Sequence, residues 1–178
     1  RYALLPYVYA QAALCAGRGH PMVRPLFFSH PQDRTSWLVE DEYLFGEDLL
    51  VAPLFSEARE REVYLPPGVW VSYFSGEARE GGRWHDLSAA EGVPAVILAR
   101  DGTAIPRAAP AQHTGLVDWA GLELAVFAAE AETAEGHVLL PGGEEPVRLR
   151  LKLREGEPRL AEDPLGGAVA WRITRTGT

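Results

Sequence analysis

The chain changes character within one stretch, which reads Asp41-Glu42-Tyr43-Leu44-Phe45-Gly46-Glu47-Asp48-Leu49-Leu50-Val51-Ala52-Pro53. Residues 41–45 predict a short helix, and the glycine that follows suits the left-handed backbone conformation of a helix stop. Residues 49–55 form a nearly continuous apolar run, which is typical of a buried strand. The stretch therefore predicts a junction between a helical part and a β-rich part of the chain.

Upstream of this junction, residues 2–16 predict a helix. Its apolar face is expected to consist of four residues at helical spacing, namely Leu4, Val8, Ala12 and Cys15. A short apolar run over residues 22–28 predicts a strand, so that helix, strand and helix together have the pattern of one (β/α) unit. The first residue is not Met and lies inside the helical pattern, so we expect the chain to be part of a longer protein.

Downstream of the junction, short apolar segments alternate with turns rich in Pro and Gly. Pro66-Pro67-Gly68 predicts a hairpin turn between strands at 63–65 and 70–74. Further strands are predicted at 96–99, 103–105, 122–127, 138–140 and 169–173. The clearest alternation places Val147, Leu149, Leu151 and Leu153 between Arg148, Arg150, Lys152 and Arg154. We interpret that basic row as the solvated face of a strand, with an anion site as the alternative.

Composition excludes several classes of protein. The formal net charge of −8 argues against a nucleic-acid partner, and no apolar run reaches the ~18–20 residues that span a bilayer. The single cysteine, Cys15, excludes an internal disulfide and fits the cytoplasm. The five histidines have no partner at ligand spacing, and phosphate loops and nucleophile elbows are missing. We therefore expect neither a metal nor a cofactor.

An ordered series of short motifs runs through residues 1–106. They are Arg1-Tyr2-x-Leu4-Leu5-Pro6-Tyr7-x-Tyr9, Gly19-His20-Pro21-Met22-x-Arg24-Pro25-Leu26-Phe27, Asp41-Glu42-Tyr43-Leu44-Phe45-Gly46, Tyr64-Leu65-Pro66-Pro67-Gly68-x-Trp70, Tyr73-Phe74-Ser75-Gly76-Glu77, Gly81-Gly82-Arg83-Trp84 and Arg100-Asp101-Gly102-Thr103-Ala104-Ile105-Pro106. In this order they resemble the region of glycoside hydrolase family 31 that closes the catalytic barrel and opens the β-domains behind it. The resemblance thins after about residue 107.

The resemblance implies a mainly β chain in three parts. Residues 1–48 would be the terminal part of a catalytic (β/α)8 barrel, residues 49–110 a proximal β-sandwich-like domain, and residues 111–178 a distal one. It also implies that the parent protein is a retaining α-glycosidase acting on α-linked glucosides or xylosides. Retention requires two carboxyl groups about 5–5.5 Å apart. The family carries both as Asp residues after earlier barrel strands, so no catalytic residue is assigned here, and this stretch is expected to brace the barrel and to be inactive alone.

Three residues are candidates for substrate binding, namely Ser29, His30 and Asp33. They follow the strand predicted at 22–28, and the carboxyl ends of barrel strands face the active site. Relatives commonly read Phe-Leu-Glu-Phe-Pro-Asp-Asp at this place, so this chain departs from the family pattern. The alternative is a loop that only caps the barrel.

The expected partners are the rest of the catalytic barrel and a neutral oligosaccharide or glycoside, with a homo-oligomer as a further possibility. Two other functions stay open. The first is a non-catalytic carbohydrate-binding β-module with an aromatic platform around Trp70 and Trp84, and the second is a purely structural or oligomerising β-domain. Packing in the core is the expectation for the aromatic residues Trp70, Tyr73, Phe74 and Trp84.

Overall fold

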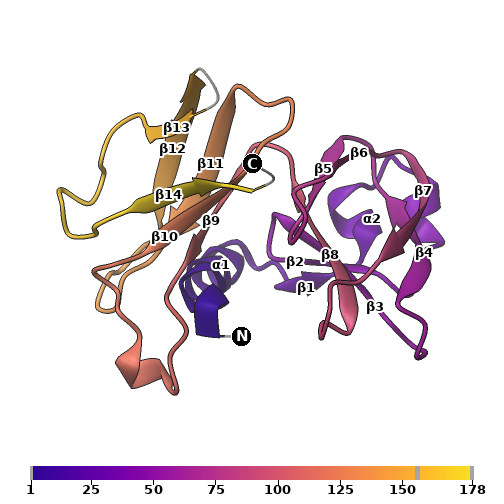
Figure 1. Cartoon of the computed structure of the whole chain (residues 1–178), viewed down its shortest axis with the longest axis horizontal. Coiled ribbons are helices and arrows are strands. Elements are labelled where there is room, and N and C mark those ends of the chain that lie inside the picture. Colours follow the sequence, from indigo (N-terminus) through magenta and orange to yellow (C-terminus); the bar gives the residue numbers. More distant parts are fainter. Residues whose placement is uncertain (1, 155–156, 177–178) are drawn as a thin grey trace. The chain divides into compact units, whose positions relative to one another are not determined.

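The structure, a computed structural model, describes residues 2–154 and 157–176 and separates them into two compact units. One unit is the contiguous segment Pro21–Asp101, which we call the 21–101 unit. The other combines residues 2–20 with Gly102–Thr176, and we call it the flanking unit. Strands dominate both units (Figure 1), which confirms the mainly β prediction. None of the helices in the described ranges is long and apolar enough to cross a membrane.

The 21–101 unit contains a six-stranded sheet and a two-stranded sheet. The larger sheet has the order β1-β2-β3-β8-β5-β6 with antiparallel neighbours throughout, and the smaller one pairs β4 with β7. The strands are β1 (Val23–Arg24), β2 (Tyr43–Phe45), β3 (Leu49–Pro53), β4 (Glu60–Leu65), β5 (Val69–Ser72), β6 (Ala78–Glu80), β7 (Arg83–Ser88) and β8 (Ala95–Arg100). Two short helices precede β2, namely α2 (Leu26–Ser29) and the 3-10 helix η2 (Thr35–Trp37).

The core of the 21–101 unit lies between its two sheets. Leu50 of β3 and Trp70 of β5 pack in one cluster with Val63 and Leu65 of β4, and all four side chains are buried. Each fully buried aliphatic side chain of this kind stabilises the fold by about 1.5–3 kcal/mol through the apolar area that it removes from water. The strand predicted at 49–55 is therefore confirmed as β3, in the middle of a β-sandwich.

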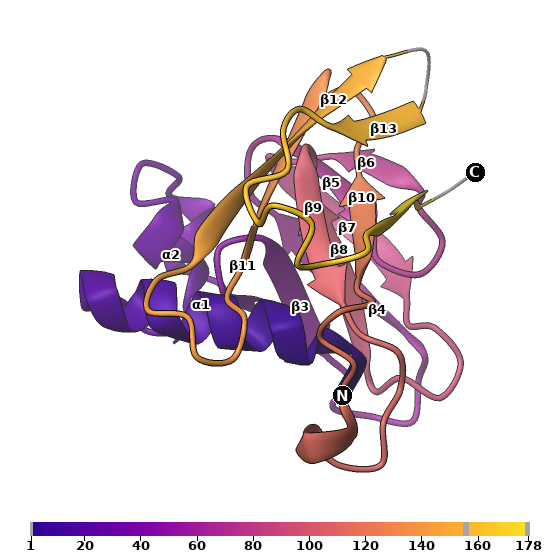
Figure 2. The same cartoon turned by 90° about the vertical axis from the view of Figure 1, so that its left-hand side faces the viewer.

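The flanking unit is one mixed sheet covered by a helix. Its strand order is β13-β12-β11-β9-β10-β14, with β10 parallel to β14 and β9 parallel to β11. The strands are β9 (Thr103–Arg107), β10 (Glu123–Phe127), β11 (Thr133–Val138), β12 (Val147–Arg154), β13 (Glu157–Leu160) and β14 (Arg172–Arg175). The helices are η1 (Tyr2–Leu4), α1 (Leu5–Arg18) and η3 (Thr114–Leu116). Figure 2 shows α1 from the side, along its whole length.

Helix α1 confirms the helix predicted at the amino terminus, but its buried face differs from the predicted one. The helix packs against β9 and β11 and buries Tyr7, Ala10 and Gln11 along with Cys15. Of the predicted face only Cys15 is buried, whereas Ala12 is exposed and Leu4 and Val8 are half-buried. The sequence pattern marks an apolar stripe, but only the sheet decides which side of the helix it covers.

Strand β12 confirms the alternation predicted in the distal part of the chain. Leu149 and Leu151 are buried, and Val147 and Leu153 pack against the same cluster. Arg148, Arg150 and Lys152 are exposed, and both arginines form ion pairs with Glu135 on the neighbouring β11. The side chain of Arg154 lies outside the described part of the chain. The basic row is thus a solvated strand face over residues 148–152.

Two elements of the expected barrel end are wrong. The strand predicted at 22–28 is confined to Val23–Arg24, and helix α2 follows directly after Pro25. A proline lacks an N–H and suits a helix start, where that donor has no partner. The helix predicted at 41–45 is strand β2, which lies between β1 and β3. Gly46 has the expected positive φ of 69°, but it ends a strand.

The predicted hairpin around Pro66-Pro67-Gly68 is also wrong, because β4 and β5 belong to different sheets. The turn carries the chain from one layer of the sandwich to the other. The compact units divide at residues 20/21 and 101/102. The predicted domains 1–48, 49–110 and 111–178 describe the parent enzyme, and they stay a prediction.

Candidate functional site

The three predicted substrate-binding residues follow one another through a turn of the 21–101 unit. Ser29 is the last residue of α2, and His30 accepts a backbone hydrogen bond of 3.1 Å from the Asp33 amide. The side chains of His30 and Asp33 then make separate contacts, with Trp70 and with Tyr64. The structure therefore joins the three residues along the backbone without bringing their side chains together into a site.

Asp33 organises the turn and anchors it to the smaller sheet. Its carboxylate accepts hydrogen bonds from the Thr35 amide at 3.1 Å, the Ser36 hydroxyl at 2.7 Å and the Tyr64 phenol at 2.8 Å. Burial opposes ionisation, but the bonds from Ser36, Tyr64 and the Thr35 amide outweigh it and hold the pKa of Asp33 below its ordinary value. These donors therefore favour the ionised form of Asp33 in the folded chain.

His30 lines a hollow of about 370 Å³ but presents no reactive group to it. Its ring lies 6.5 Å from that of Trp70, and its Nε2 atom is buried without a hydrogen-bond partner among the described residues. Burial lowers the pKa of His30, the nearby Arg100 lowers it further, and Asp33 opposes both. The imidazole is therefore neutral at pH 7. The rest of the lining consists of Pro67, Gly68, Val69, Trp70, Arg100 and Asp101.

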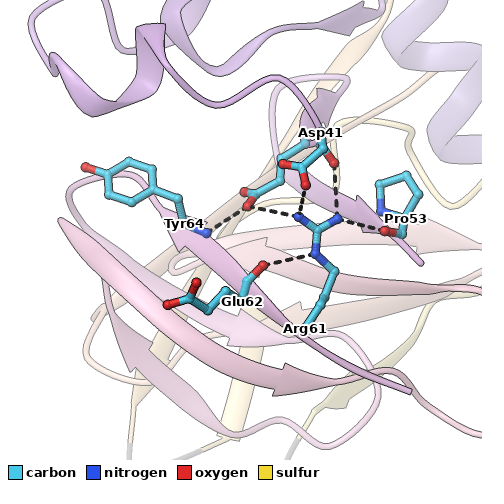
Figure 3. A network of polar contacts seen from close by, with 6 residues as sticks. Asp41, Pro53, Arg61, Glu62 and Tyr64 are labelled. Carbon is cyan, nitrogen blue, oxygen red and sulfur yellow. Dashed lines mark hydrogen bonds and ion pairs between the residues drawn. The ribbon is translucent and has the colours of Figure 1, made fainter. Parts of the chain in front are cut away.

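A second cluster, which the sequence did not single out, surrounds Arg61 on β4 (Figure 3). Its Nε donates to the Glu62 carbonyl at 3.0 Å, and its Nη1 donates to the carbonyls of Pro53 at 2.7 Å and Asp41 at 3.3 Å. Its Nη2 donates to Asp41 Oδ2 at 2.5 Å and lies 3.8 Å from Glu42 Oε1. Every nitrogen of the guanidinium is thus occupied, and we call these residues the Arg61 cluster.

Glu42 is the buried member of the Arg61 cluster. Its side chain has no exposed area, its Oε1 accepts the Tyr64 amide at 2.8 Å, and its Oε2 has no hydrogen-bond partner among the described residues. Burial raises the pKa of Glu42 to about 7, although the Tyr64 amide and Arg61 favour the anion. The clue in the sequence was a pair of acidic residues placed directly before an apolar strand. The sequence pattern predicts a helix over residues 41–45 and so does not reveal the buried carboxyl.

The carboxyl groups of Asp33 and Glu42 are both engaged in contacts within the 21–101 unit. Asp33 is held ionised by its donors, and Glu42 is closed off from solvent, whereas cleavage needs two carboxyl groups on opposite sides of an anomeric carbon. Within residues 2–154 and 157–176, no group of three or more His, Cys, Asp and Glu is placed to hold a metal ion.

The predicted aromatic residues divide between core and surface. Trp70 is 1% exposed, and its indole donates to the Pro66 carbonyl at 2.8 Å, so the expectation of core packing is confirmed for it. Phe74 and Trp84 are 50% and 46% exposed, so the same expectation is wrong for these two. Trp70 is thus too buried to form an exposed platform together with Trp84, although it lines the hollow beside His30.

Comparison with known proteins supplies the context for these geometries. Residues 19–105 match the model described as the glycosyl hydrolase family 31 C-terminal domain. Alpha-glucosidase 2 of Bacillus thermoamyloliquefaciens is 41% identical over 107 residues, which are 59% of this chain and 13% of that enzyme. An alpha-xylosidase of Emericella nidulans is 34% identical over 115 residues, which are 60% of this chain and 14% of that enzyme. The chain thus spans about an eighth of these relatives.

Solved structures extend the similarity in fold across both units. The family 31 alpha-xylosidase of Xanthomonas citri aligns with a TM-score of 0.77 over 98% of this chain and 20% of its own, at 23% identity. The cycloalternan-forming enzyme of Listeria monocytogenes aligns with a TM-score of 0.74 over 85% of this chain and 15% of its own, at 28% identity. With the matched domain and the sequence relatives, this likeness places the chain in the carboxy-terminal portion of glycoside hydrolase family 31, the family to which it belongs.

Proposed function

We propose that the chain is the carboxy-terminal part of a retaining α-glycosidase that hydrolyses α-linked glucosides or xylosides. The match of residues 19–105 to the family's C-terminal domain carries this proposal. The relatives are named as alpha-glucosidases and alpha-xylosidases, which supports α-linked glucosides and xylosides as substrates. The catalytic acid and nucleophile then lie in a barrel upstream of this stretch.

The role proposed for this stretch is to brace that barrel. The Arg61 cluster supports such a role, because it ties strand β4 to the segment before β2 and to the end of β3 through fully used donors. The three substrate-binding candidates Ser29, His30 and Asp33 are proposed to shape the turn that approaches the barrel mouth. A rigid support of this kind contributes to catalysis by fixing the loops around the active site.

Residues 1–48 are proposed as the terminal part of the barrel, and helix α1 is the element that supports this proposal. Its Tyr7 side is buried by the sheet of the flanking unit, while Ala12 is exposed and Val8 is half-buried on another side. A helix with apolar residues on two sides suits a position between two layers. In the parent enzyme the second layer would be the barrel.

Hydrolysis assays of the chain and of its parent enzyme test the proposed function. We expect the parent to cleave an aryl α-glucoside or an aryl α-xyloside with retention, and the 178-residue chain to cleave neither. The outcome that overturns the proposal is sustained turnover by the chain alone that is abolished by replacing one of its own carboxylates, such as Asp33→Asn. A parent that inverts the anomeric configuration would overturn the retaining mechanism.

A further inference from the structure

A small hollow opens in the 21–101 unit where the edge of β7 approaches strands β5, β6 and β8. Its volume is about 210 Å³, and it is separate from the Arg61 cluster and from the hollow beside His30. Drug-sized ligands usually fill about 300–1,000 Å³. The occupant of this hollow is therefore small, of the size of a single sugar ring.

Unpaired backbone groups form one wall of the hollow. Strand β7 has β4 as its single partner, so its other edge carries free N–H and C=O groups. Ala89, the residue after β7, donates its N–H to the Arg59 carbonyl at 2.8 Å. Because antiparallel strands alternate, the backbone groups of Ser88 and Asp86 then face the free edge, and both residues line the hollow.

Hydroxyl and charged side chains form the opposite wall. Ser72 ends β5 and Ser75 lies in the turn before β6. Their hydroxyl oxygens accept from the Ser75 amide at 3.4 Å and the Glu77 amide at 3.3 Å, and their O–H groups can donate to a ligand. Arg79 on β6 forms an ion pair of 2.5 Å with Glu77 through its Nη1. Nothing in the described part of the chain accepts a hydrogen bond from the Nε or Nη2 of Arg79, which leaves these donors for a ligand.

The floor of the hollow is apolar. It consists of Leu87 on β7 and of Val96 and Leu98 on β8, and the last two are 6% and 1% exposed. A sugar ring presents a face of C–H groups and a rim of hydroxyl groups. An apolar floor between two walls of donors and acceptors matches both parts of that chemistry.

Charge favours a neutral occupant. Two charged side chains of the lining, Arg79 and Glu77, form an ion pair with each other, so their charges balance. Asp86 also lines the hollow, but its side chain points to the face of β7 opposite that of the adjacent Leu87, so Asp86 contributes its backbone edge. With these charges balanced, the hollow favours neither an anion nor a cation.

We propose that this hollow binds one neutral pyranose ring, which bridges the free edge of β7 and the β5–β6 turn. The proposal does not depend on the glycosidase activity of the parent, because every contact lies within residues 72–98.

Amide NMR titrations of the 178-residue chain with D-glucose and D-xylose test the proposal. We expect saturable shifts at Ser72, Asp86, Ser88 and Leu98, with dissociation constants in the millimolar range. Ser88→Pro removes one edge N–H and Arg79→Ala removes the free guanidinium donors, and each is expected to weaken binding at least tenfold. Glu91→Gln removes an exposed carboxylate from the turn before β8, outside the lining, and should leave binding unchanged.

Several results would overturn the proposal. One is a set of amide shifts that does not saturate with added sugar. Another is unchanged sugar binding by Arg79→Ala, and a third is a set of amide shifts that clusters outside the residues lining the hollow. Inorganic phosphate and glycerol serve as probes of other chemistry. Saturation of the same amides by phosphate would indicate an anion site, and an equal response to glycerol would indicate small polyols in general. If Ser88→Pro fails to fold, as judged by its amide spectrum, the effect of Arg79→Ala on sugar binding tests the proposal by itself.

Discussion

Arg61 binds Asp41 at two points, with Nη2 at 2.5 Å from the carboxylate and Nη1 at 3.3 Å from the main-chain carbonyl. The two residues are twenty positions apart. The planar guanidinium is suited to such a double contact, because its donors point in fixed, divergent directions. The pair fixes the chain before β2 against β4, and its side chains are 49% exposed at Asp41 and 15% exposed at Arg61.

Replacement of Arg61 by Met is expected to destabilise the 21–101 unit by about 2–4 kcal/mol, because carbonyls of Asp41, Pro53 and Glu62 lose their donor. Arg61→Lys should recover only part of the loss, since one ammonium cannot reach all of these acceptors. Urea unfolding followed by tryptophan fluorescence measures the change. Arg83→Met, at a side chain 60% exposed, is the control and should cost less than about 0.5 kcal/mol. An equal loss of unfolding free energy in Arg61→Met and Arg83→Met would contradict a stabilising role of the Arg61 cluster.

The buried carboxyl of Glu42 predicts an unusual dependence of stability on pH. Its pKa is about 7 in the folded chain against an ordinary value of 4.5, so the folded state holds a proton that the unfolded state releases. Stability from this group is complete below pH 4.5 and is lost as the pH rises to about 7, by an amount on the order of 3 kcal/mol.

Glu42→Gln tests whether the pH dependence of stability comes from Glu42, because the amide cannot ionise. Unfolding free energies measured between pH 4.5 and 8 should fall less steeply in this variant than in the unmodified chain. Glu91→Gln, which removes a carboxylate from an exposed turn, is the matched control. An identical slope in the Glu42 variant would assign the effect to other groups.

Any side chain at position 46 is expected to destabilise the fold. Its φ of 69° is strained for residues with a Cβ, and its amide donates to the Met22 carbonyl at 2.8 Å, which fixes the conformation. Gly46→Val should lower the free energy of unfolding by about 1–3 kcal/mol. Gly17→Ala is the comparison variant, and it is expected to have the opposite effect on stability. Gly17 lies inside α1 with open space around it, so alanine should stabilise the chain by about 0.5–1 kcal/mol. A stabilising Gly46→Val would refute the assignment.

Strand β12 allows its two faces to be compared directly. Leu151→Ala removes a side chain that is 1% exposed and should cost about 2–4 kcal/mol of unfolding free energy. Arg150→Ala, on the opposite face with a side chain 58% exposed, should cost less than about 1 kcal/mol, although it loses an ion pair with Glu135. Thermal unfolding of both variants decides, and a larger loss at Arg150 would mean that the basic row is structural.

The sequence predicted most reliably the elements whose pattern is local. Alternation over residues 147–153 predicts β12, because one buried face imposes a period of two whatever its neighbours are. Residues 22–28 were misread because a short apolar run has the same appearance in a strand and in a helix. Pro25 was the available clue, since a helix begins directly after it.

Elements defined by distant partners could not be predicted from local patterns. Strand β2 is three residues long and exists because β1 and β3 flank it, whereas its own sequence permitted a helix. The Arg61 cluster has the same origin, since its acceptors come from three separate segments. The candidates Ser29, His30 and Asp33 were chosen from a strand end that the structure lacks, so their substrate-binding role stays a prediction.

The interrupted connectivity of the flanking unit has a consequence for synthesis on the ribosome. Helix α1 leaves the ribosome before the 21–101 unit, whereas β9 and β11, against which it packs, follow only after that unit has been translated. At translation rates of about 5–20 residues per second the helix waits for several seconds with its apolar side uncovered. The contiguous unit can complete its own core in that interval. Slow codons or chaperone binding near residue 101 would therefore change the yield of the flanking unit before that of its neighbour.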